Sequence, residues 1–69
     1  MKTAGEIHQI VERIKKNMVG CTGCMIKDFV IDFLKYHNPA SREAIVELSQ
    51  YKENAFVQQM ALDALKLCD

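Results

Sequence analysis

Hydrophobic residues are densest in the stretch from Cys21 to His37, where they recur at every third or fourth position. This spacing is typical of one face of an α-helix. The face consists of Met25, Ile26, Phe29, Val30, Phe33 and Leu34, and the positions left for water are Lys27, Asp28, Asp32 and Lys35. The pattern predicts a largely buried helix around which the other segments pack.

An amphipathic stretch precedes this segment. Thr3-Ala4-Gly5-Glu6 has the form of a capping box, in which the Thr3 hydroxyl accepts a hydrogen bond from the Glu6 amide. The hydrophobic positions that follow are Ile7, Ile10, Val11, Ile14 and Met18. Gly20 is expected to end this helix, because glycine readily adopts the positive φ of a C-terminal cap.

Two further helices are expected after His37. Pro39 disfavours helical geometry at Asn38, so the second helix should end there, and the same pair can begin the next helix with Asn38 as N-cap and Pro39 at the first helical position. That third helix, near Pro39 to Gln50, has the weakest hydrophobic stripe. Asn54 is expected to cap the fourth, which carries Phe56, Val57, Met60, Ala61, Ala64, Leu65 and Cys68 on one face.

The links between these segments are short, and short links place consecutive helices as antiparallel neighbours. No segment shows the alternating pattern of a strand. The sequence therefore predicts an all-α fold, a compact four-helix bundle made of two antiparallel helical hairpins, with residues 1–69 forming a single helical domain.

Composition and charge narrow the function classes. Nine basic residues balance nine acidic ones, whereas proteins that bind nucleic acid usually carry a basic excess. No hydrophobic run approaches the roughly 20 residues of a membrane span. The first residues are charged rather than signal-like, and an odd number of cysteines argues against a secreted disulfide framework. We therefore expect a cytoplasmic protein without nucleic-acid or membrane partners.

The only residues that indicate chemistry are Cys21 and Cys24, a C-x-x-C pair at the start of the second helix. Two thiols at this spacing can form a redox-active disulfide or supply half of a zinc site. They can also be structural, with Cys24 a small core residue and Cys21 a loop thiol. Cys68 is expected in the core, and it lies about 22 Å from the pair if the helices have the expected directions. A zinc ion would therefore have to be shared between two chains, each giving Cys21 and Cys24.

The segment Val19-Gly20-Cys21-Thr22-Gly23-Cys24 resembles the motif of the alkylhydroperoxidase-like all-helical family, in which a redox C-x-x-C also opens a helix. The resemblance implies thiol redox chemistry at Cys21 and Cys24. That family has a proton-shuttling histidine four positions after the second cysteine, and this chain has Asp28 there.

Residues 38–68 resemble a HEAT-type helical hairpin. The matching positions are Ala44, Leu48, Asn54, Val57, Ala61, Ala64 and Leu65. The resemblance implies a scaffold that binds partners through stacked helices. HEAT arrays generally need three or more repeats, and this chain has room for two hairpins, so a minimal or self-associating version is implied.

Ile31, Val46 and Leu62 fall outside the hydrophobic stripes of their helices, and three such residues can form a partner-binding patch. No catalytic constellation beyond the cysteine pair can be assembled, and no cofactor is expected unless zinc binds. The favoured function is thus a non-enzymatic protein-interaction module, an adaptor or inhibitor. It would bind a partner through Ile31, Val46 and Leu62 and could also form homo-oligomers. The alternative is a thiol redox or metal-bridged protein that uses Cys21 and Cys24.

Overall fold

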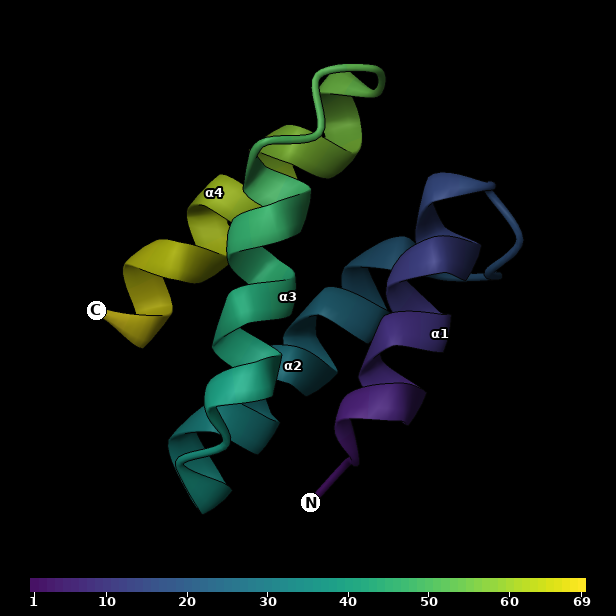
Figure 1. Cartoon of the computed structure of the whole chain (residues 1–69). Coiled ribbons are helices and arrows are strands. Elements are labelled where there is room, and N and C mark those ends of the chain that lie inside the picture. The colour runs from purple at the N-terminus through teal and green to yellow at the C-terminus, as the bar shows by residue number, and fades with distance from the viewer.

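A computed structural model describes all 69 residues and contains four helices and no strand. The helices are α1 (Ala4–Lys15), α2 (Thr22–Tyr36), α3 (Pro39–Ser49) and α4 (Ala55–Cys68). Each helix runs opposite to the one before it (Figure 1). The predicted all-α four-helix fold is confirmed. No helix combines the length and the hydrophobicity that a membrane crossing requires.

The helices begin where their capping residues predict. The Thr3 hydroxyl accepts from the Glu6 amide at 3.1 Å and donates to the Glu6 carboxylate. The Asn38 side chain accepts from the Ala40 amide, and that of Asn54 accepts from the two amides at the start of α4. Each side chain thus provides an acceptor for amides that have no partner within the helix.

The predicted end of the first helix at Gly20 is wrong. Asn17 adopts a positive φ of 56° instead, and the amides of Asn17 and Met18 donate to the carbonyls of Ile14 and Arg13. This pair of bonds is a Schellman motif, and asparagine is the residue that most often replaces glycine in it. Because the motif closes at Asn17, the chain has already left the helix when it reaches Gly20.

The centre of the bundle is α3, not α2 as the hydrophobic pattern predicts. α3 packs against each of the other helices, whereas α1 packs mainly against α3. The small side chains of Ser41 and Ala44 are buried there, and they allow neighbouring helices to approach closely. Twelve buried hydrophobic residues from all four helices form one core: Ile7, Val11, Ile14, Ile26, Phe29, Val30, Ala44, Ile45, Leu48, Val57, Ala61 and Ala64.

Two positions of α2 differ from the predicted pattern. Leu34 is exposed although its spacing places it on the hydrophobic face. Asp32, expected in water, is only 5% exposed. Asp32 tolerates burial because three groups donate hydrogen bonds to its carboxylate: Asn38 Nδ2 at 2.7 Å, Ser41 Oγ at 2.8 Å and the Lys2 amide at 3.3 Å.

Candidate functional site

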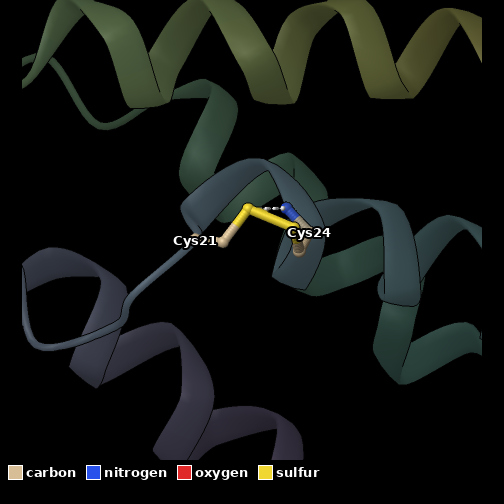
Figure 2. Close-up of a disulfide and its surroundings, with 2 residues drawn as sticks. All are labelled: Cys21 and Cys24. Atoms are coloured by element: carbon tan, nitrogen blue, oxygen red, sulfur yellow. Dashed lines mark hydrogen bonds between the residues drawn. A yellow bond between two sulfur atoms is a disulfide. The ribbon is translucent and has the colours of Figure 1, made fainter.

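The Cys21–Cys24 pair lies at the N-terminus of α2 (Figure 2). Cys21 is the N-cap residue of this helix and has extended backbone geometry, and Cys24 lies in the first helical turn. The Cys21 Sγ accepts a hydrogen bond from the Cys24 amide at 3.3 Å. A cysteine thus occupies the position that serine, threonine, aspartate or asparagine usually fills.

The two sulfurs are joined in a disulfide, and the Cα atoms of the two residues are 5.3 Å apart. Both cysteines are exposed to solvent. The interpretation of Cys24 as a core residue is therefore wrong. At 100° per residue, Cys24 lies about 160° around α2 from the buried Ile26, on the side that faces away from the core.

This placement favours thiolate chemistry when the pair is reduced. The amides of a first helical turn and the helix dipole stabilise a negative charge at the N-terminus, and cysteines in such positions are more readily ionised. Lys27 and Asp28 follow one turn later with opposite charges. The backbone amides of α2 are therefore the main source of stabilisation for a Cys21 thiolate.

Cys68, the third cysteine, has a different environment. It lies at the end of α4, half-buried against the hydrophobic core, as the sequence predicts. Burial raises the pKa of its thiol, against the opposing effect of Arg42. Cys68 is thus less readily ionised than an exposed cysteine, and it does not belong to the disulfide site.

A metal ion held by one chain has no suitable ligand set, because no three histidine, cysteine or acidic side chains gather closely enough. The disulfide must be reduced before Cys21 and Cys24 can act as ligands, since only free thiolates bind zinc. Zinc shared by two reduced chains stays a prediction. Titration of the reduced protein with zinc, followed by the molecular mass in light scattering, tests it.

A groove of about 300 Å³ adjoins the disulfide. It runs between α2 and α4 and is lined by Gly23 and mainly by hydrophobic residues: Ile26, Val30, Met60, Ala64 and Leu67. Gly23 precedes Cys24 directly in the sequence, so one end of the groove lies close to the disulfide, although neither cysteine lines it. The sequence pattern did not reveal this groove, because each of its walls belongs to a different helix.

The three predicted partner-binding residues occupy different places. Leu62 is 40% exposed and shares a side of α4 with Gln58 and Asp69, both of which bind α3. Val46 is partly buried on α3. Ile31 is 48% exposed and lies on the outer side of α2, seven residues after Cys24. Their partner-binding role stays a prediction.

Asp32 and its donors form the second polar centre of the molecule. Hydrogen bonds from Asn38, and then from Ser41 and the Lys2 amide, lower the pKa of Asp32 although burial alone raises it. No buried side-chain polar atom in the structure is left without a hydrogen-bond partner. A centre that is closed in this way has no unpartnered buried group to offer a ligand, which favours a structural role.

Comparisons of this chain with known protein families, with curated proteins and with solved structures give no match. The resemblances to the alkylhydroperoxidase-like family and to HEAT-type hairpins therefore stay predictions. Any functional conclusion has to be drawn from the geometry of the chain itself.

Proposed function

We propose that this chain is a thiol–disulfide exchange protein that uses Cys21 and Cys24 as its redox pair. The observation that supports this proposal best is the disulfide at the solvent-exposed N-terminus of α2. A bond that spans three positions within one turn does little to hold distant segments together. Its exposure leaves both sulfurs open to attack by another thiol.

The proposed cycle uses Cys21 as the attacking group, because its sulfur already accepts the Cys24 amide. In the reduced chain, the Cys21 thiolate attacks one sulfur of a partner disulfide and releases the other as a thiolate. Cys24 then loses its proton and attacks the Cys21 sulfur in the mixed disulfide. The second partner sulfur leaves, both partner thiolates take up protons, and two electrons have passed from the cysteine pair to the partner.

The expected cytoplasmic location is part of this proposal. Disulfides in a reducing compartment are usually transient and catalytic rather than structural. A pair that is oxidised by a partner and reduced again by cellular thiols would fit that pattern.

The test is disulfide exchange with glutathione. Wild-type protein should pass between dithiol and disulfide as the ratio of reduced to oxidised glutathione is varied, and Cys24→Ser should accumulate a mixed disulfide at Cys21. Cys21→Ser should accumulate less of the mixed disulfide, which would form at Cys24, because Cys24 does not occupy the N-cap position. Mass spectrometry of alkylated samples measures each species. A pair that stays oxidised at every ratio, or equal trapping at the two cysteines, would contradict the proposal.

A second candidate function is the protein-interaction module predicted from Ile31, Val46 and Leu62. The exposure of Ile31 and Leu62 favours it. If these residues mediate self-association, light scattering should show an oligomer that Ile31→Ser combined with Leu62→Ser converts to a monomer. A wild-type chain that is monomeric at all concentrations would remove self-association from this candidate.

A further inference from the structure

We propose that the groove between α2 and α4 binds the hydrophobic residues that flank the reacting cysteine of a partner polypeptide. This inference rests on the proposed function, because it supplies the substrate class for the same disulfide. The occupant is a segment of another protein with a cysteine and a large hydrophobic side chain within about three residues of it.

The groove ends next to the disulfide, at Gly23. Gly23 lines it and lies between the two cysteines, and a side chain added at Gly23 would meet Met60 Sδ at 3.6 Å. A polypeptide joined to Cys24 through its own cysteine therefore reaches the groove past Gly23, which has no side chain to block it. From Gly23 to Val30 the groove follows α2 for about 10 Å, the length of about three extended residues.

The lining favours an uncharged hydrophobic segment. Leu67 is 69% exposed and Met60 is partly buried on the α4 wall, so both gain hydrophobic contact when the groove is filled. The charged groups of the lining are Lys27 on one wall and Asp63 on the other. Because their charges oppose each other, the groove has no net preference for an acidic or basic partner, and each can bind a backbone group of opposite polarity.

The other groove of the molecule does not share these properties. It lies between α1 and α3, has a volume of about 140 Å³ and includes His8, Glu43 and Glu47 in its lining. None of the three cysteines adjoins it in the sequence. The groove between α2 and α4 is thus both the larger and the more hydrophobic of the two.

The test uses a chain with Cys24→Ser and Cys68→Ser, in which Cys21 is the only thiol. Cys21 is activated with a small aromatic disulfide and offered two synthetic peptides, each with one cysteine. One peptide carries leucine at the two positions after the cysteine, and the other carries serine there. The leucine peptide should form the mixed disulfide about tenfold faster, because burial of one such side chain is worth about one order of magnitude.

Leu67→Gln in the same background should reduce this preference to about threefold or less. Phe56→Gln is the matched control, because Phe56 also lies on α4 and is 84% exposed but does not line the groove. That variant should keep the full preference. Equal rates for the two peptides, or the same loss in both variants, would overturn the inference.

Reaction with glutathione separates this inference from the proposed function. If Cys21 reacts with glutathione but shows no peptide preference, the groove assignment fails and the redox function stands. If Cys21 does not react with glutathione either, the redox function itself fails. A dimer that is lost on Leu67→Gln would show that a second copy occupies the groove, which also overturns the inference.

Discussion

α2 carries a polar centre near each of its ends, and the two centres have opposite environments. Cys21 and Cys24 at its start are exposed, and apart from one backbone hydrogen bond they are free to meet a partner. Asp32, one turn before its end, is buried and accepts from three groups that lie on other segments. A polar group with all its partners inside the molecule stabilises the fold, whereas one without them is available for chemistry.

The position of Asn38 shows how the buried centre connects the elements. Its side chain accepts from Ala40 as the cap of α3, and its Nδ2 donates to both Asp32 and the Lys2 carbonyl. One amide thus joins α2, α3 and the segment before α1. Loss of the carboxylate would leave the Ser41 hydroxyl and one of the two Asn38 N–H groups buried without acceptors, which is costly.

Asp32→Ala should therefore have the largest effect on stability of the changes considered. We expect the Tm to fall by about 15 °C in a domain of this size. Asp28→Ala is the matched control, because Asp28 lies four residues earlier on the same helix and is exposed. Its Tm should change by only about 2 °C. Circular dichroism during heating measures both, and similar losses in the two variants would show that the buried centre is not structural.

Low pH should reduce the stability that the buried Asp32 centre provides. The pKa of Asp32 is lower in the folded chain than in the unfolded chain. The contribution of its carboxylate to the free energy of unfolding is therefore complete above the ordinary aspartate pKa of about 3.9, and it is lost as the pH falls from there toward the folded pKa. The Tm difference between wild type and Asp32→Ala should thus be constant from pH 7 to about pH 5 and shrink at lower pH. A difference that grows in acid would contradict the assignment.

The disulfide should contribute less to thermal stability than the hydrogen bonds of Asp32 do. Its closed loop contains only four residues, so the entropy that it removes from the unfolded chain is small. We expect Cys21→Ser combined with Cys24→Ser to lower the Tm by about 10 °C. Thermal unfolding of wild type with and without reductant should give a similar difference. A loss as large as that of Asp32→Ala would mean that the pair is a structural crosslink.

Much of the fold could be predicted from local sequence, because helix starts depend on neighbouring residues. Thr3, Asn38 and Asn54 cap the helices that their spacing predicts. The end of α1 could not be chosen locally, because Asn17 and Gly20 can both adopt positive φ. The central role of α3 was missed for a different reason: a stripe of small residues has low hydrophobicity, although small side chains are what a central helix needs.

The candidate site was predicted in part. The C-x-x-C spacing allowed the disulfide that the structure contains, but it favoured a structural role for the two cysteines and also left a zinc site shared between chains open. The outward direction of Cys24 could have been found from its 160° separation from Ile26 on α2. The burial of Asp32 and the groove beside Gly23 could not, since both depend on how separate helices pack.

Gly23→Ala gives the smallest expected effect and the only gain in stability. Gly23 lies in α2 without positive φ, and an added Cβ would be in ordinary contact with Met60 Sδ at 3.6 Å. Alanine should therefore raise the Tm by about 2–3 °C, because it loses less conformational entropy in a helix than glycine does. The same methyl group fills space at the Gly23 end of the groove, so exchange with the leucine peptide should slow more than exchange with glutathione does. A fall in Tm would mean that the start of α2 is packed as tightly as the surroundings of Asp32, and the contrast between the two ends of the helix would then be lost.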